Sequence, residues 1–322
     1  MAELRWDPLA GRWVVLAPGR VDRPHAGAAR TSTVRADDNV GACPFCPGHE
    51  NETPPEVARR PPGVADGSGW DVRVVPNRYP IVDRGARDER TEGGDLRRRR
   101  SATGVHEVAI LSPAHDRSLA QLDDPQVLQT LRTLQDRARV HAAAGHLYTQ
   151  LLVNHGVDAG ASLTHPHAQI VAIDLVPPTI DEEIAHLTDG DSCVLCRELA
   201  RLDHDASLRV AGQDATIWCP WWSSTAFELL LAPRRHRGRF EDAGPELEAV
   251  AVVLRDGLAR LDRSLGDPSY NLFVHSLPAD REVDYHWHIH IRPRLQVDAG
   301  FELGTGIPVN TVDPAEAARR LR

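Results

Sequence analysis

The sequence predicts an α+β fold in which two similar halves share a largely antiparallel sheet with helices packed against it. Each half opens with a CxxC pair, and the same succession of apolar, helical and histidine-rich segments follows each pair. The spacing of the histidines is also the same, because 50 residues separate His115 from His165 and 50 separate His236 from His286. Similarity at a fixed internal spacing is typical of a repeated supersecondary unit.

We expect the first half to cover residues 1–175 and the second to cover residues 190–322. An apolar run that ends in proline precedes the first histidine of each half, at Ala109–His115 and at Leu229–His236. The segment from about Ile173 to Gly190 is interpreted as the connection between the halves, because it contains two adjacent prolines and proline is typical of loops and turns.

A helix is expected next in each half. Asp124-Pro125 and Gly244-Pro245 mark the two starts, because proline suits the first helical turn. Apolar residues then recur at positions i, i+3, i+4 and i+7, which is the pattern of an amphipathic helix. They are Val127, Leu128, Leu131 and Leu134 in the first half and Leu247, Val250, Val253, Leu254 and Leu258 in the second.

Two strands are expected to complete each half. The first strand is apolar, at Tyr148–Val153 and again at Tyr270–Val274. The second strand is rich in histidine, at His165–Gln169 and again at His286–His290. Alternate residues of a strand share one face of its sheet, so we expect the histidines of each strand to point the same way.

Composition excludes several classes of protein. The chain has 322 residues, a formal net charge of -9 and no lysine, which excludes a Schiff-base enzyme and a Walker-A ATPase. A net negative chain without a basic tract is a poor candidate for binding nucleic acid. Residues Met1–Asp7 lack the apolar region of a signal peptide, and no apolar run reaches the ~20 residues of a membrane span. We therefore expect a soluble, cytoplasmic protein.

The cysteines predict two metal sites. Disulfides are not expected without an export signal, so each CxxC pair is interpreted as two thiolate ligands. A structural zinc site takes four ligands in a tetrahedron, usually cysteine and histidine, and each half supplies such a set. The expected ligands are Cys43, Cys46, His115 and His165 in the first half, and Cys193, Cys196, His236 and His286 in the second. Two thiolates and two imidazoles favour zinc over iron in the second site.

The segment His165–Gln169 predicts a nucleophile. A neutral imidazole attacks phosphorus well when its other nitrogen is held by a hydrogen bond, and His167 is the candidate. Gln169 would lie on the same face of the strand and could donate to a phosphoryl oxygen in the transition state. The small, polar segment Asn154–Ser162 could bring backbone N–H groups and the Ser162 hydroxyl close to phosphates.

Together with these residues, six stretches of the chain resemble the galactose-1-phosphate uridylyltransferase family of the histidine-triad superfamily. They are Arg20–Pro24, Cys43–Gly48, Val75–Asn77, Ser112–His115, His165–Gln169 and Gly300–Glu302. The resemblance covers nearly the whole chain and implies two histidine-triad-like halves. It also implies a ping-pong nucleotidyltransferase that acts on an NDP-sugar, with sugar 1-phosphate or phosphate as the other substrate.

The resemblance also implies roles for single residues. His167 corresponds to the histidine that attacks the α-phosphorus, and Gln169 favours transfer because the hydrolases of the superfamily carry a third histidine there. The implied substrate-binding residues are Arg20 and Asn77 for the nucleotide, Asn154, Ser162 and Gln169 for phosphate, and Glu302 for the sugar. A homodimer whose active sites borrow residues from the partner is implied as well.

The sequence leaves three candidate functions open. UDP-glucose:hexose-1-phosphate uridylyl transfer comes first, because that activity names the family. The segment Ala299–Gly306 and the second CxxC pair resemble instead the branch that includes plant ADP-glucose phosphorylase, so an adenylyltransferase with phosphate as acceptor is the alternative. A zinc-stabilised nucleotide-binding protein without turnover is the third.

The second histidine-rich strand leaves a further question open. By the repeat, His288 takes the position of the nucleophile and His290 takes that of Gln169. One interpretation is a second catalytic centre, a hydrolase that uses His288. We favour one metal ligand, His286, followed by two structural or partner-facing histidines, because the second half lacks a segment like Asn154–Ser162.

Overall fold

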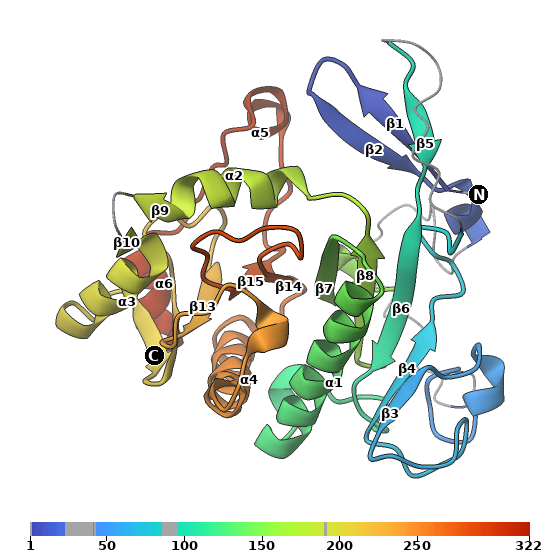
Figure 1. Cartoon of the computed structure of the whole chain (residues 1–322). Helices are drawn as coiled ribbons and strands as arrows, with labels where there is room; N and C mark the ends of the chain where they lie inside the picture. Colours follow the sequence, from blue (N-terminus) through green and yellow to red (C-terminus); the bar gives the residue numbers. More distant parts are fainter. Residues whose placement is uncertain (1, 23–40, 42, 86–95, 190–191) are drawn as a thin grey trace.

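One ten-stranded sheet crosses the whole molecule (Figure 1). The computed structural model describes residues 2–22, 41, 43–85, 96–189 and 192–322. The strand order is β11-β12-β13-β15-β14-β7-β8-β6-β4-β3, and every pairing within this order is antiparallel. The predicted α+β fold with a largely antiparallel sheet is therefore confirmed.

Each half supplies five consecutive strands of the sheet. The strands of the first half are β3 (Ala58–Arg60), β4 (Val72–Pro76), β6 (Gly104–Ile110), β7 (Tyr148–His155) and β8 (His167–Ile173). Those of the second half are β11 (Arg209–Gly212), β12 (Ala215–Trp218), β13 (Leu229–Pro233), β14 (Tyr270–His275) and β15 (His288–Pro293). The halves meet where β7 pairs with β14, with Val153 opposite Leu272 and Leu151 opposite Val274. This pairing makes the sheet continuous.

Two long helices lie side by side against the sheet (Figure 1). They are α1 (Asp124–Ala143) and α4 (Glu246–Leu265), which begin at the predicted Asp-Pro and one residue after the predicted Gly-Pro. Asp123 caps α1 by accepting from the backbone N–H of Gln126 at 2.8 Å, as an N-cap aspartate does. The apolar faces of both helices and the sheet form the main hydrophobic core.

Smaller elements surround this frame. The remaining α-helices among the described residues are α2 (Pro178–Leu187), α3 (Val194–His204), α5 (Gly300–Thr305) and α6 (Pro314–Leu321). The remaining strands are β1 (Glu3–Asp7), β2 (Arg12–Leu16) and β5 (Arg99–Ser101), which form a three-stranded sheet, and the short pair β9 (Thr188–Asp189) and β10 (Ser192–Cys193). No helix among the described residues is long and apolar enough to cross a membrane.

The histidine-rich strands begin later than the sequence pattern predicted. β8 begins at His167 and β15 begins at His288, so His165 and His286 each precede their strand. Pro166 has no N–H to donate to a neighbouring strand. In both halves an imidazole also bonds to a backbone carbonyl just before the strand. Nδ1 of His167 lies 2.8 Å from the His165 oxygen, and Nδ1 of His288 lies 2.9 Å from the His286 oxygen.

A buried carboxylate fastens β6 to α1. Glu107 is fully buried, and both its oxygens accept from the Arg137 guanidinium, at 2.7 and 2.8 Å, while His141 Nε2 lies 3.1 Å away. Burial opposes ionisation, but the hydrogen bonds from His141 and Arg137 hold the pKa of Glu107 below its usual range. Neighbouring residues of a strand point to opposite faces, so His106 lies on the face away from α1.

Candidate active site

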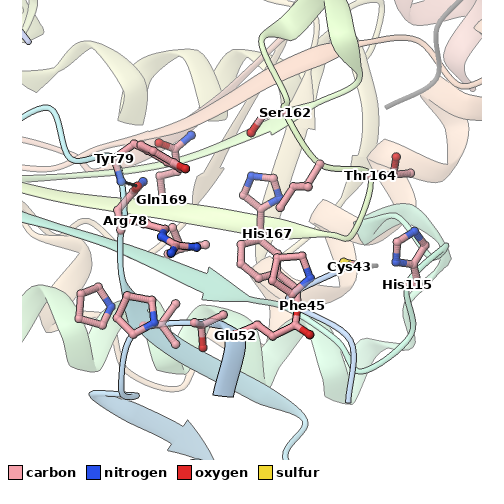
Figure 2. Close-up of a pocket in the computed structure, with 18 of the residues that line it drawn as sticks. Cys43, Phe45, Glu52, Arg78, Tyr79, His115, Ser162, Thr164, His167 and Gln169 are labelled. Atoms are coloured by element: carbon pink, nitrogen blue, oxygen red, sulfur yellow. Dashed lines mark hydrogen bonds between the residues drawn. The ribbon is translucent and has the colours of Figure 1, made fainter. Parts of the chain in front are cut away.

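The sheet face away from α1 carries a cavity of about 320 Å³ at the first CxxC segment (Figure 2). Its lining includes five residues predicted from the sequence to act on the substrate, Arg20, Asn77, Ser162, His167 and Gln169, and two of the predicted metal ligands, Cys43 and His115. β8 supplies His167 and Gln169, while Asn77 follows β4 directly. The lining also includes Phe45, Tyr79 and Thr164, to which the sequence assigned no role, although Phe45 lies within the Cys43–Gly48 stretch and the other two lie close to recognised motifs.

The geometry of His167 suits a nucleophile. The side chain is 7% exposed and faces the cavity, with its ring edge-on to Phe45 at 5.6 Å between centroids. His167 Nδ1 donates to the backbone carbonyl of His165 at 2.8 Å. This bond fixes the proton on Nδ1 and leaves the lone pair on Nε2, which is the tautomer that a nucleophilic imidazole requires.

The segment after β7 is anchored by the second half of the chain. Asn271 on β14 donates from Nδ2 to Asn154 Oδ1 and to the carbonyl of Ala159, each at 2.9 Å. The side chain of Asn154 points to the same face as those of His167 and Gln169, because β7 pairs with β8 in register up to Val153 opposite Ala168. Asn154 does not line the cavity itself, whereas Ser162 does.

Gly156 packs closely against Ser269 of the second half. Its φ is +79°, and a Cβ at this position would lie 2.1 Å from Ser269 Oγ. We expect Gly156→Ala to lower the free energy of unfolding by about 2 kcal/mol or more, because strain and overlap add. Urea unfolding measures this. The matched control is Gly160→Ala, where φ is also positive (+86°) but no atom lies within 4 Å of the added Cβ. Equal free energies of unfolding for the two variants would contradict the close packing of Gly156 against Ser269.

The first predicted ligand set converges. The ligand atoms of Cys43, Cys46, His115 and His165 all lie within 4.8 Å of one another. Cys46 Sγ lies 3.3 Å from His115 Nδ1 and 3.7 Å from His165 Nδ1. Zinc–sulfur bonds of about 2.3 Å and zinc–nitrogen bonds of about 2.0 Å at tetrahedral angles place sulfur and nitrogen about 3.5 Å apart. The arrangement therefore fits a tetrahedral metal ion.

Hydrogen bonding prepares His165 for this role. Its Nε2 lies 2.7 Å from the carbonyl of Ser112, so the proton sits on Nε2 and Nδ1 turns toward the thiols. Burial lowers the pKa of His165 to about 4, which keeps the ring neutral at neutral pH. A neutral imidazole with its outer nitrogen bonded to a carbonyl is the usual form of a metal-ligating histidine.

The second predicted ligand set converges in the same way. The ligand atoms of Cys193, Cys196, His236 and His286 form a second group within 4.8 Å. Cys196 Sγ lies 3.2 Å from His236 Nδ1 and 3.5 Å from His286 Nδ1. The outer nitrogens are again bonded, His286 Nε2 to the carbonyl of Pro233 at 2.9 Å and His236 Nε2 to Asp284 at 2.7 Å. Both CxxC segments therefore build groups that could bind a metal.

A third such group was not found from the sequence. Glu183, His275, His288 and His290 bring one carboxylate and three imidazoles within 4.8 Å of one another. Glu183 Oε1 lies 2.8 Å from His275 Nδ1, and Tyr285 donates to Glu183 Oε2 at 2.7 Å. Nitrogen and carboxylate donors suit zinc or iron. His288 thus occupies the position equivalent to His167 but is enclosed by other possible ligands.

Glu302 does not line this cavity. It lies in the first turn of α5, which projects away from the sheet at the top of Figure 1. Its carboxylate accepts from the backbone N–H of Ala299 at 3.0 Å and so caps the helix. The structure therefore brings together all the predicted substrate-binding residues except Asn154, which stands just beside the cavity, and Glu302.

Comparison with known proteins finds similar chains. Residues 1–177 match the family described as galactose-1-phosphate uridyl transferase, N-terminal domain. The chain is 31% identical to ADP-glucose phosphorylase of Arabidopsis thaliana over 99% of this chain and 92% of that protein. It is 25% identical to galactose-1-phosphate uridylyltransferase of Thermotoga maritima, covering 100% of this chain and 98% of that one.

Solved structures show the same likeness. The crystal structure of the Arabidopsis thaliana ADP-glucose phosphorylase with bound ADP-glucose superposes with a TM-score of 0.76 at 29% identity, covering 100% of this chain and 99% of the other. A structure described as uridylyltransferase superposes with a TM-score of 0.78 at 27% identity, covering 99% and 97%. The similarity therefore extends over both halves of the chain.

Proposed function

The chain belongs to the galactose-1-phosphate uridylyltransferase family of nucleotidyltransferases, and from that premise we propose that it transfers a nucleotidyl group from an NDP-sugar through a covalent intermediate on His167. The observation that carries the proposal is the bond from His167 Nδ1 to the carbonyl of His165. It directs the Nε2 lone pair to a cavity that also contains Gln169 and Ser162.

The proposed reaction has two steps, in which the nucleotidyl-histidine forms and is then consumed. Nε2 of His167 attacks the α-phosphorus of the donor, the bond from that phosphorus to the bridging oxygen breaks, and sugar 1-phosphate leaves with the electron pair. An oxygen of the acceptor phosphate then attacks the same phosphorus, the phosphorus–nitrogen bond breaks, and His167 is restored. The Nδ1 proton stays in place through both steps, and the amide of Gln169 donates to the developing charge.

Two donors follow from the relatives. Uridylyl transfer from UDP-glucose to a hexose 1-phosphate is the activity after which the family is named. Adenylyl transfer from ADP-glucose to phosphate is the second candidate, and the greater identity to an ADP-glucose phosphorylase favours it. Both donors use the same nucleophile and the same two steps, so the identity of the base is the question for experiment.

Zinc is the metal that we propose for the two CxxC groups. Cys43, Cys46, His115 and His165 would hold one ion, and Cys193, Cys196, His236 and His286 the other. Four protein ligands leave no position for a reacting water, so the ions would stabilise the fold. The first site matters for catalysis indirectly, because His165 is both a ligand and the carbonyl partner of His167.

A homodimer would give Glu302 a place in catalysis. Its helix and the residues just after it expose apolar side chains, with Phe301 55% exposed and Leu303 75% exposed on α5, and Ile307 57% exposed beyond its end. Clustered exposed apolar residues are typical of interaction sites. We propose that a second copy of this chain covers them and that Glu302 contacts the sugar bound in the partner's cavity.

Intact-protein mass spectrometry tests the proposed function. The protein is mixed with UDP-glucose or with ADP-glucose, without acceptor, as wild type and as His167→Gly. We expect the wild type to gain the mass of one UMP or one AMP and the variant to gain neither, which would identify the mechanism and the base together. No adduct with either donor would defeat this assignment and favour a zinc-stabilised nucleotide-binding protein without turnover.

A further inference from the structure

We propose that His106 is a positioning residue for nucleotidyl transfer, because its ring fixes which end of the Gln169 amide faces the phosphoryl group. The inference rests on the proposed function, since it concerns the donor that Gln169 presents to the transition state. His106 lies on β6, is 4% exposed and has no part in the mechanism derived above. Its ring is placed between two residues of the cavity.

The sheet register brings His106 to Gln169. β6 and β8 are antiparallel, with Val108 opposite Gln169. His106 is two residues from Val108 on the same face, so it is the diagonal neighbour of Gln169, within reach of a long side chain. His106 Nε2 lies 3.0 Å from Gln169 Oε1 and 3.0 Å from Asn77 Nδ2.

The other ring nitrogen decides the direction of the bond. The backbone N–H of Ile81 donates to His106 Nδ1 at 3.2 Å. A neutral imidazole carries one proton, so with Nδ1 accepting, the proton sits on Nε2. Of the two neighbours at 3.0 Å only the oxygen of Gln169 can accept it, because the Asn77 amide is turned by its own bond, in which Asn77 Oδ1 accepts from the N–H of Tyr79 at 2.8 Å.

The bond to His106 decides which end of the Gln169 amide faces the cavity. With Oε1 bonded to His106, the NH₂ group is the end that remains for the cavity, where it can donate to a phosphoryl oxygen. The opposite orientation would present a carbonyl oxygen to an anion and repel it. A side-chain amide has no intrinsic preference between its two orientations, so the hydrogen-bond partner sets the choice. His106 therefore makes Gln169 a donor.

Two substitutions of similar size separate donation from packing. In His106→Gln the new side chain keeps an N–H that can donate to Gln169, whereas in His106→Glu an ionised carboxylate can only accept and draws the NH₂ group of Gln169 away from the cavity. At about pH 8.5, above the usual carboxyl range, we expect His106→Glu to lower the single-turnover rate of adduct formation roughly 100-fold or more, as the loss of one transition-state donor does. We expect His106→Gln to stay within roughly tenfold of wild type.

A double-mutant cycle tests whether His106 acts through Gln169. If His106 acts through Gln169, His106→Glu should cost little further rate once Gln169→Ala is present, because coupled residues are not additive. Urea unfolding measures the free energy of unfolding of each variant. Equal rates for His106→Gln and His106→Glu, or full additivity with Gln169→Ala, would overturn the inference while the wild-type adduct still upheld the proposed function. Absence of the wild-type adduct would defeat the function itself.

Discussion

Replacing His167 with glycine is expected to abolish nucleotidyl transfer while leaving the fold intact. The substitution removes Nε2, which forms the covalent bond, and we expect kcat to fall at least roughly 10⁴-fold, as the loss of a nucleophile does. The unfolding midpoint should change little, because the side chain borders a cavity and packs edge-on against Phe45. Exchange of labelled sugar 1-phosphate into the NDP-sugar measures the rate.

The matched control is His288→Ala. His288 holds the equivalent place in the second half, with Nδ1 bonded to the carbonyl of His286 as His167 is bonded to that of His165. It faces Glu183, His275 and His290 instead of the cavity. We expect His288→Ala to keep adduct formation within roughly tenfold of wild type. The reverse pattern, with His288 essential and His167 dispensable, would transfer the nucleophile to the second half.

Loss of the first metal site should affect both stability and rate. We expect Cys46→Ser to remove one equivalent of metal per chain, to lower the free energy of unfolding by about 3 kcal/mol or more, and to slow adduct formation roughly 10- to 100-fold. The rate effect follows because a displaced His165 carries its carbonyl away from His167 Nδ1. Mass spectrometry measures the metal content, urea unfolding measures the free energy of unfolding, and single-turnover kinetics measure the rate of adduct formation.

Cys196→Ser separates the two sites. It removes the corresponding thiolate from the second group, beside His236 and His286. We expect it also to lose one equivalent of metal and stability, but to change the rate of adduct formation less than roughly tenfold, because no ligand of this group borders the cavity. If neither variant lost metal, the proposal of two structural ions would fail.

Elements with a strong local signal could be predicted from the sequence. The long helices carry proline at their starts and an apolar 3.6-residue period, and α1 and α4 begin at the expected dipeptide or one residue later. The two metal groups could be found because a CxxC pair supplies two ligands through local geometry, and the matching spacing of 50 residues identified the histidines.

Residues that depend on tertiary placement could not be predicted. Glu183 lies on α2, in the segment that the sequence showed only as a connection, and its approach to His275 follows from how that helix crosses the sheet. Asn271 reaches Asn154 only because β14 pairs with β7 in one particular register. His106 gave no signal because its role depends on Gln169 of another strand. None of these contacts leaves a spacing pattern in the chain.

The strand order also bears on how such a protein can diversify. Counted outward from the β7–β14 junction, the strands of the two halves follow the same sequence of equivalent elements, so the junction resembles the self-complementary contact of a two-fold symmetric pair of identical chains. A duplicated gene fused into one frame keeps that contact while its copies diverge independently. One copy can then retain a nucleophile at His167, while the other turns the same position, His288, toward the cluster with Glu183.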